Sequence, residues 1–293
     1  MYNKLKINYK VRTGFFMEHS RLLDVFNKLQ DQVQEQLESQ APPLKIDLRK
    51  VPDFIDNTIK VLLPEYYFSN QDIDFTLNNL TKLHIQVQQL LSYTGNKQLI
   101  NQNSLAFIEK IPELRAIILQ DIKAAYQKDP AAKSYQEIVL TYPGVFSIIV
   151  HRISHEFYKM GYTLIARVIS EYSHSKTGID IHPGATIGHS FFMDHGTGIV
   201  IGETTIIGNN VTVYQGVTLG AFSFQRDHNG EIIKGGNRRH PVLEDDVTVY
   251  AGATILGGET VIGKGSVVGG NVWLTKSLPP RSKVITKIQN KML

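Results

Sequence analysis

The sequence predicts an α+β protein in which a helical N-terminal region is followed by a parallel β-helix. Two observations carry this prediction: a period of about six residues in the C-terminal half, and apolar stripes of helical period before it. The six-residue period is formed by Ile181, Ile187, Met193, Ile201, Ile207, Val213, Leu219, Leu243, Val249, Ile255, Ile262, Val268 and Leu274. Neither an α-helix nor an alternating strand produces such a period. In a parallel β-helix each six residues form one flat face and a corner, and the aliphatic residue points inward.

Residues 15–176 carry apolar residues at intervals of three and four, which is typical of amphipathic helices. The first stripe comprises Leu22, Leu23, Phe26, Leu29, Val33 and Leu37. Helices are predicted over about 22–37, 70–90, 104–128, 134–141, 144–159 and 161–172. Asp129-Pro130 ends the third, because proline disfavours helical geometry in the residue before it. We expect these stripes to pack on one another or on another subunit.

The predicted domains are the helical region 1–176 and the β-helix 177–280, followed by a tail over 281–293. Because a β-helix buries a continuous core whatever its task, we look for function where the repeat is interrupted. The first interruption, residues 194–198, adds two positions to the repeat. The second, the loop 221–241, is glycine-rich and basic, and loops of this length are usually functional or disordered. We expect it to leave the coil at a corner and cross the surface or reach a neighbouring subunit.

Composition argues against several classes of protein. Charged residues make up 20% and hydrophobic residues 42%, as in ordinary soluble proteins, and the net charge of +4 does not indicate nucleic-acid binding. No apolar run approaches the ~18 residues that a membrane span needs, and the N-terminus lacks the apolar core of a signal peptide. The absence of cysteine removes disulfides, thiol nucleophiles and cysteine metal ligands. A soluble cytoplasmic protein is expected.

His195 is the leading candidate for chemistry. It lies at the first interruption, it adjoins Asp194, and Gly196 and Gly198 leave open space beside it. Asp180 precedes it by fifteen residues, a little less than a turn of eighteen, so its carboxylate is expected on the neighbouring coil within reach of the imidazole. A carboxylate on one ring nitrogen leaves the other free to accept a proton. The alternatives are a structural histidine and a polar start to the first coil.

Other polar groups allow a second kind of site. The histidines at 182, 189, 195 and 240 could hold zinc between subunits, but their spacing is a weak match and no metal site is expected. Arg238, Arg239 and His240 at the foot of the long loop offer cations for a carboxylate or phosphate. The alternative is a solvated base of the loop.

An ordered set of motifs resembles one family. The motifs are DIHPGATIG at 180–188, MDHGTGIVIGE at 193–203, QGVTLG at 215–220, RHP at 239–241, and the helical segment 121–158 with DPA at 129–131 and YPGVF at 142–146. Over residues 105–280 the chain resembles serine O-acetyltransferase. Sugar and xenobiotic acetyltransferases share the hexapeptides but not this ordered set. In the family, acetyl-CoA donates its acetyl group to the hydroxyl of L-serine, and the product enters cysteine synthesis.

The resemblance implies a role for each matched residue. His195 would be the general base that takes the serine hydroxyl proton, and Asp180 would orient it. The residues implied for L-serine are Asp129 and Asp194 for the ammonium, Arg239 for the carboxylate, and His240 near the side chain. Acetyl-CoA, the co-substrate, would lie between adjacent coils near Gly220, Ala221, Ala251 and Gly270. No metal is required.

The resemblance also implies partners. The β-helix would be left-handed, and the protein a homotrimer or a dimer of trimers with active sites between subunits. L-cysteine would enter the serine pocket as a competitive feedback inhibitor. Two departures matter: the loop 221–241 is longer than in the bacterial enzymes and carries Phe222 and Phe224, and the chain ends in Lys-Met-Leu rather than isoleucine. We therefore hypothesise that it forms no tight complex with the sulfhydrylase.

Three alternatives stay open beside this reading. The first is acetyl transfer to another hydroxyl, such as that of homoserine or a sugar. Asp129, Asp194 and Arg239 favour an amino acid, because together they supply both charge signs. The second is a metal-dependent β-helix hydratase, which needs several histidines gathered at one metal. The third is a catalytically silent subunit, which intact Asp180 and His195 do not favour.

Overall fold

The computed structural model describes residues 22–34, 46–67, 73–93, 97–222, 227–231, 233 and 238–286. The chain divides into two compact units, Met1–Lys45 and Ile46–Leu293. In the first unit, residues 22–34 form a helix in which Leu22, Leu23, Val25, Phe26, Leu29 and Val33 are each more than half exposed. The first predicted stripe is therefore helical; its last member, Leu37, lies outside the described residues. No helix in the described ranges has the length and apolar character that crossing a membrane requires.

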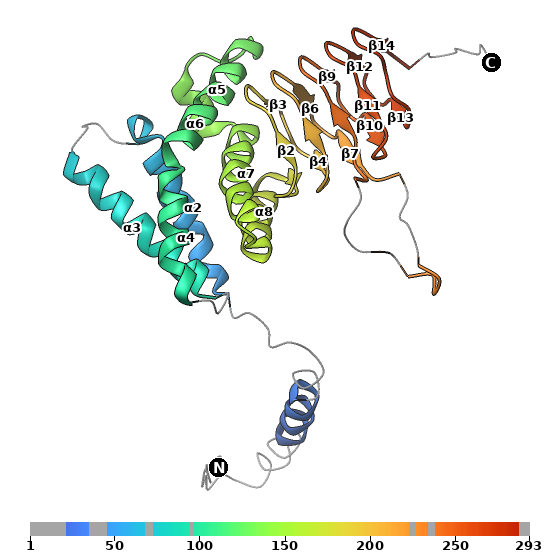
Figure 1. The fold of residues 1–293 in the computed structure, drawn as a ribbon. Helices are drawn as coiled ribbons and strands as arrows, with labels where there is room; N and C mark the ends of the chain where they lie inside the picture. The colour runs from blue at the N-terminus through green and yellow to red at the C-terminus, as the bar shows by residue number, and fades with distance from the viewer. Residues whose placement is uncertain are drawn as a thin grey trace, which may run out of the picture. The chain divides into compact units, whose positions relative to one another are not determined.

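The second unit begins with the helical region (Figure 1). Its helices are α2 (Val51–Leu62), α3 (Ile73–Ser92), α4 (Lys97–Glu109), α5 (Ile111–Lys128), α6 (Tyr135–Thr141), α7 (Pro143–Lys159) and α8 (Thr163–Thr177), with 3₁₀ turns η1 (Leu48–Lys50) and η2 (Pro64–Tyr66). The predicted helix 104–128 is wrong as one element: a new helix begins at Ile111, because Pro112 in its first turn lacks the N–H that would continue the previous helix. Helix α2 was not among the predicted helices. Phe54, Phe107 and Phe157 pack together at the centre of this region.

Helix α8 leads into the β-helix. It ends at Gly178, whose φ of 68° is the left-handed conformation that closes many helices. The strands follow as β1 (Asp180–Ile181), β2 (Thr186–Ile187), β3 (Phe192–Asp194), β4 (Val200–Ile201), β5 (Ile206–Ile207), β6 (Thr212–Tyr214), β7 (Thr218–Gly220), β8 (Val242–Leu243), β9 (Thr248–Val249), β10 (Thr254–Leu256), β11 (Val261–Ile262), β12 (Val267–Val268), β13 (Trp273–Leu274) and β14 (Lys283–Val284).

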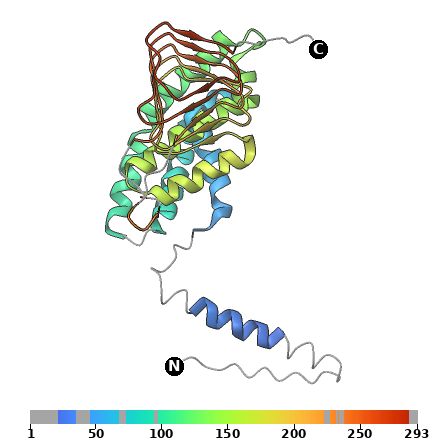
Figure 2. The same cartoon turned by 90° about the vertical axis from the view of Figure 1, so that its right-hand side faces the viewer.

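The strands stack into three parallel sheets, one for each face of the coil (Figures 1 and 2). Sheet A is β1-β4-β7-β10-β13, sheet B is β2-β5-β8-β11, and sheet C is β3-β6-β9-β12-β14. The register gives the length of each turn. Val200 pairs with Thr218, the regular step of eighteen residues. Asp180 pairs with Val200, a step lengthened by two residues at the first interruption, and the long loop lengthens the step from Thr218 to Thr254.

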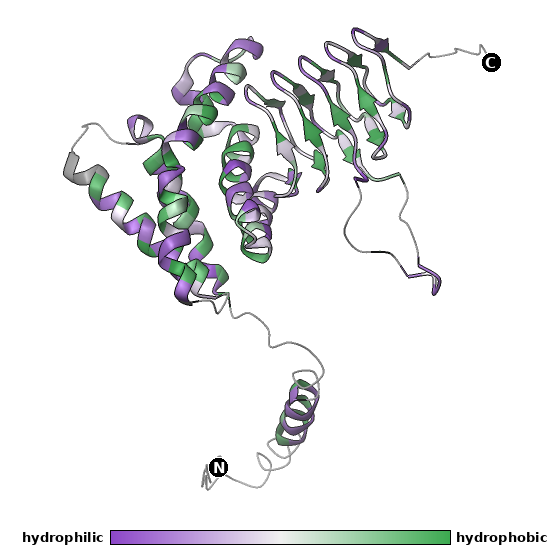
Figure 3. Cartoon of the chain, viewed as in Figure 1, coloured by the Kyte–Doolittle hydropathy of each residue, from purple (hydrophilic) through white to green (hydrophobic). Residues whose placement is uncertain are grey.

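The predicted aliphatic positions fill the interior of the coil. From Ile181 to Val268 they are at most 6% exposed, while Leu274 in the last turn is only partly buried. Figure 3 shows these strands as the hydrophobic part of the coil, alternating with hydrophilic corners. The predicted fold class, a helical region followed by a parallel β-helix, is confirmed.

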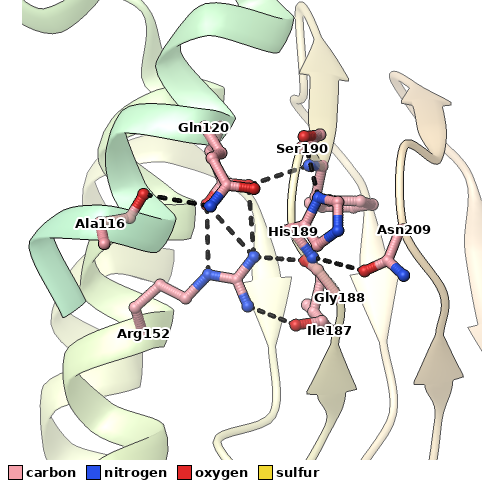
Figure 4. Close-up of polar contacts among 10 residues, drawn as sticks. Ala116, Gln120, Arg152, Ile187, Gly188, His189, Ser190 and Asn209 are labelled. Atoms are coloured by element: carbon pink, nitrogen blue, oxygen red, sulfur yellow. Dashed lines mark hydrogen bonds and ion pairs between the residues drawn. The ribbon is translucent and has the colours of Figure 1, made fainter. Parts of the chain in front are cut away.

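A buried ion pair joins the helices to the first turn of the coil. Arg152 of α7 is paired with Asp121 of α5 at 3.2 Å, and the two side chains are 7% and 1% exposed. The guanidinium donates to the carbonyls of Ile187 and Gly188 (Figure 4). Asp121 Oδ1 accepts from Phe191 N at 2.9 Å. Burial raises the pKa of Asp121, and Arg152 opposes that rise. This contact fixes α5 and α7 against β3.

Candidate active site

The first interruption forms the corner between β3 and β4, here called the His195 corner (residues 194–198). Other turns make this corner with one left-handed residue: Gly216, Gly252 or Asn271. This turn uses three, with φ of 58° at His195, 84° at Gly196 and 79° at Gly198. A left-handed histidine is uncommon, and such residues often occur at functional sites.

The bulge turns the imidazole outward. The His195 side chain is 71% exposed, and its Nε2 lies 3.8 Å from Asp194 Oδ1. The backbone beneath it is tightly packed, because a Cβ at Gly196 would overlap the Ile179 side chain. The imidazole therefore projects from a rigid corner and is accessible to a substrate.

Asp180 lies beside this corner at the start of β1. Asp180 N donates to Ile199 O at 2.9 Å, and Gly198 N donates to Gly178 O at 2.8 Å, so residues 198–199 stack on 178–180. The end of the His195 corner therefore stacks on the segment that leads into Asp180, one lengthened coil step of twenty residues earlier.

The carboxylate of Asp180 faces α8 in this structure. Arg167 Nη2 lies 4.0 Å from Asp180 Oδ1, and the ligand atoms of Glu171 and His174 lie within 4.8 Å of it. Within the described ranges, no hydrogen bond or ion pair joins Asp180 to His195. The orienting role of Asp180 stays a prediction.

Asp129 is placed near the same corner by α5. It caps the end of that helix; its Oδ1 accepts from Ala131 N at 2.8 Å, and its Oδ2 accepts from Tyr142 OH at 2.5 Å. The hydrogen bond to Asp129 raises the pKa of Tyr142 to about 12, and the charge of Asp194 adds to the rise. Lys128, the residue before Asp129, donates to Asn210 O and Thr212 Oγ1 on the second turn. Asp129 and Asp194 thus both place negative charge near Tyr142.

The foot of the long loop forms a second group, here called the Arg239 corner (residues 202–204 and 238–240). Thr204 Oγ1 accepts from Arg239 N at 2.9 Å and from His240 N at 3.1 Å, and Thr204 N donates to His240 Nδ1 at 3.1 Å. The His240 ring lies over Gly202, where a Cβ would overlap it. Burial, followed by the charge of Arg239, lowers the pKa of His240 to about 4, so His240 is neutral at pH 7.

A pocket of about 390 Å³ opens at the Arg239 corner. Its lining includes Tyr158, Gly184, Glu203, Arg238 and Arg239. Glu203 accepts hydrogen bonds from both Tyr158 OH and Arg239. Tyr158 and Glu203 were not among the predicted site residues; the available signal was the position of Glu203 directly after the repeat pair Ile201-Gly202.

The two corners lie at opposite ends of the strands of sheet A. His195 precedes strand β4, whereas Gly202 and Glu203 follow it. The extended segment between the corners spans about 13 Å, at roughly 3.3 Å per residue. The residues predicted for acetyl-CoA divide in the same way: Ala251 and Gly270 precede strands of sheet A, and Gly220 and Ala221 end one. One chain therefore does not gather all the predicted site residues around one small substrate.

The four histidines considered as zinc ligands are dispersed. His182 packs its ring edge-on against Tyr158, His189 contacts Ser190, and His240 is seated on Thr204. In the part of the chain that the structure describes, the group of metal-ligand side chains that lies close together is instead Glu171, His174 and Asp180. This arrangement gives the hydratase alternative no support.

Comparison with known proteins decides the family. The family model "Serine acetyltransferase, N-terminal" matches residues 76–148. The plasmid serine acetyltransferase of Synechococcus elongatus is 50% identical over 226 residues, which cover 74% of this chain and 70% of that protein. The chain belongs to the serine acetyltransferase family. The serine acetyltransferase of Bacillus subtilis is 46% identical over 169 residues, covering 58% of this chain and 73% of that protein.

Solved serine acetyltransferase structures share the fold. Serine acetyltransferase 1 of Entamoeba histolytica, crystallised with L-cysteine, superimposes with a TM-score of 0.74 at 36% identity, covering 83% of this chain and 87% of that chain. The Neisseria gonorrhoeae enzyme, crystallised with serine, has a TM-score of 0.56 at 25% identity, covering 83% and 96%. The family resemblance, the enzyme class and the left-handed β-helix are confirmed. Membership implies acetyl-CoA as the co-substrate.

Proposed function

We propose that the protein transfers the acetyl group of acetyl-CoA to the hydroxyl of L-serine, giving O-acetyl-L-serine and CoA for cysteine biosynthesis. The observation that carries the proposal is the exposed imidazole of His195, projected from a rigid corner beside the carboxylate of Asp194. Solved relatives hold serine or L-cysteine, which supports an amino-acid acceptor.

The proposed reaction begins with a proton transfer. The serine hydroxyl gives its proton to His195 as its oxygen attacks the thioester carbonyl, because an unassisted hydroxyl is a weak nucleophile at neutral pH. The tetrahedral oxyanion then collapses and expels the CoA sulfur, which takes the proton back from the imidazolium. Asp180 is proposed to orient the imidazole once substrate is bound. A positioned base of this kind contributes about 10²–10⁴-fold to the rate.

Serine binding requires groups from both corners. We assign its ammonium to Asp129 and Asp194 and its carboxylate to Arg239, with His240 near its side chain. Because the corners are a strand apart in one chain, we propose that the Arg239 corner of a neighbouring copy completes the site. A head-to-tail contact of this kind closes into a ring, in agreement with a homotrimer or a dimer of trimers. Gly220 and Ala221 lie at the opposite end of the sheet A strands from Ala251 and Gly270. This separation supports the same arrangement, with groups from two copies, for acetyl-CoA.

The first test measures CoA release from acetyl-CoA with L-serine, homoserine and a panel of sugars. Serine-dependent release that falls by two to four orders of magnitude in His195→Ala supports both the substrate and the base. Release with homoserine or a sugar alone would overturn the assignment of serine. Added L-cysteine is expected to raise the apparent KM for serine without changing kcat, because it offers the same ammonium and carboxylate.

The composite site has its own test. His195→Ala and Arg239→Ala chains, each inactive alone, are co-expressed in equal amounts and purified together. If His195 and Arg239 come from different copies, about a quarter of the sites regain both residues by random assembly. Activity that stays at the level of the single variants would contradict a shared site. The predicted lack of a tight sulfhydrylase complex concerns the tail, whose residues 287–293 lie outside the described ranges.

A further inference from the structure

A second pocket lies within the helical region, here called the helical-region pocket. Its volume is about 370 Å³, and its lining comes from α2, α6, α7, α8 and the residue after η2. The residues assigned to L-serine and acetyl-CoA lie outside this lining. Pockets of this size commonly bind small molecules.

The lining of the helical-region pocket suits a ligand with an aromatic body. Ile55, Ile59 and Val139 are buried apolar side chains in its walls. Tyr67 and Tyr172 add two aromatic rings. Because aromatic groups pack favourably on one another and on aliphatic side chains, a ring is the group that these walls fit best.

The charged residues of the lining leave a positive charge available. Asp56 is paired with Lys60, whose Nζ lies 2.6 Å from Asp56 Oδ2. The Nζ of exposed Lys176 lies 5.2 Å from the centre of the Tyr172 ring, and within the described ranges it has no ion-pair partner. An ammonium has three N–H donors, so it can bind a carboxylate while it contacts a ring. The pocket is therefore complementary to a single negative charge.

The wall formed by α7 connects this pocket to the substrate groups. Tyr142 lines the pocket, and its OH donates to Asp129 Oδ2 at 2.5 Å. Gly144, two residues later, packs on the strand that leads to His195, since a Cβ there would lie 2.5 Å from Met193 O. A ligand that restricts the Tyr142 ring therefore also restricts the carboxylate of Asp129.

The wall formed by α8 makes a second connection. Thr177 lines the pocket, and its Oγ1 accepts from Ser147 Oγ of α7 at 3.0 Å. The next residue, Gly178, accepts at its carbonyl from Gly198 N of the His195 corner at 2.8 Å. Both walls thus end against the corner that carries the imidazole.

We propose that the helical-region pocket is a second ligand site, that it binds a small molecule with an aromatic body and one carboxylate, and that its occupancy strengthens serine binding. The carboxylate pairs with Lys176, and the ring packs beside Tyr142. Asp129 is then held in place before the ammonium of serine arrives, which lowers the ordering cost of serine binding. The effect on serine rests on the proposed function, whereas the binding itself does not.

Titration calorimetry with 3-phenylpropionate tests the site without activity. The wild type is expected to bind with a Kd below about 1 mM. The neutral 3-phenylpropanamide is expected to bind about 3–10-fold more weakly, and Lys176→Gln is expected to weaken 3-phenylpropionate by the same factor. The matched control is Lys123→Gln, which removes an exposed lysine of α5 outside the pocket.

A second pair of variants tests the position of the ring. Leu140→Trp enlarges a side chain of the lining and is expected to weaken 3-phenylpropionate at least about fivefold. Its control is Leu164→Trp, because the two leucines are 49% and 47% exposed. Absence of binding by the wild type, or equal binding within either pair of variants, would overturn the proposal.

Kinetics measure the coupling between the two sites. Saturating 3-phenylpropionate is expected to lower the KM for L-serine about 2–5-fold, with kcat within about twofold. Linkage requires that saturating serine lower the Kd of 3-phenylpropionate by the same factor. An unchanged KM for serine, or a rise as expected from competition for Arg239, contradicts the coupling. If the wild type releases no CoA with serine, the proposed function fails, while calorimetry still decides whether the pocket binds.

Discussion

The two interruptions of the β-helix hold their functional side chains in different ways. At the His195 corner, two extra residues form a left-handed bulge, and the imidazole is 71% exposed. At the Arg239 corner, a much longer insertion ends in His240, which is 8% exposed and bonded to Thr204. The short insertion is restrained by its backbone and the long one by its side chains. The length of an insertion therefore says little about how firmly its last residues are held.

The largest expected effect separates chemistry from stability. His195→Ala is expected to lower kcat about 10²–10⁴-fold and to leave the free energy of unfolding within about 0.5 kcal/mol, because the side chain is exposed. His240→Ala is expected to lower the free energy of unfolding by about 1–3 kcal/mol, because Thr204 N loses its acceptor, His240 Nδ1, and a buried space opens. Kinetics and denaturant unfolding measure the two. A destabilised His195→Ala protein would remove the contrast.

A substitution at Gly202 tests whether the packing of the His240 ring depends on the absence of a side chain at position 202. Gly202→Ala places a methyl group into the His240 ring, and is expected to lower the free energy of unfolding by about 1–3 kcal/mol. It is also expected to raise the KM for serine, since Arg239 adjoins the displaced ring. The control is the double variant with His240→Ala, in which the methyl group meets no ring. If the two losses are additive, the clash is not the cause.

Low pH is expected to destabilise the Arg239 corner through protonation of His240. Its pKa is about 4 in the folded protein, against about 6.5 unfolded, so between these values the unfolded state binds more protons. The free energy of unfolding is expected to fall by about 2 kcal/mol as the pH drops from about 6.5 to about 4. Denaturant unfolding across this range measures the slope. The same slope in His240→Asn would assign it to other groups, such as buried His151, whose pKa burial also lowers.

The smallest effect concerns the backbone of the His195 corner alone. His195→Gly and His195→Ala both remove the imidazole and are expected to be equally inactive. Glycine adopts the left-handed conformation without a Cβ penalty, so the glycine variant is expected to be about 0.5–1 kcal/mol more stable than the alanine variant. Denaturant midpoints of the pair measure the difference. Equal midpoints would show that the corner stores no strain.

The sequence was most informative where structure repeats. The six-residue period predicted the buried positions of the coil, because each inward side chain stacks on its equivalent one turn later. The same period exposed the bulge at His195 as two surplus residues. Helix boundaries were harder, since the apolar stripe continues across Pro112 and conceals the break between α4 and α5.

Contacts between distant segments were not predictable. Glu203 is hydrogen-bonded to Tyr158, which lies 45 positions before it, and to Arg239, which lies 36 positions after it. The pairing of Asp121 with Arg152 depends on how two helices dock. No local period encodes either contact. The position of Asp180 shows the same limit: the sequence placed it near His195, but the facing of its carboxylate toward Arg167 follows from where α8 ends.

The contact of the Asp121–Arg152 ion pair with the first turn of the coil limits which substitutions the two sides of this joint tolerate. Among the described residues, the hydrogen bonds from Asp121 and Arg152 to the first turn go to main-chain atoms, namely the carbonyls of Ile187 and Gly188 and the amide of Phe191. Main-chain carbonyls are common to all amino acids, and the amide to all but proline. Substitutions at Ile187, and at Phe191 by any residue but proline, therefore keep the atoms that form these hydrogen bonds, whereas a side chain at Gly188 would collide with Gly208 and Asn209. On the other side, these hydrogen bonds depend on two charged side chains, and removing either leaves the other buried without its ionic partner.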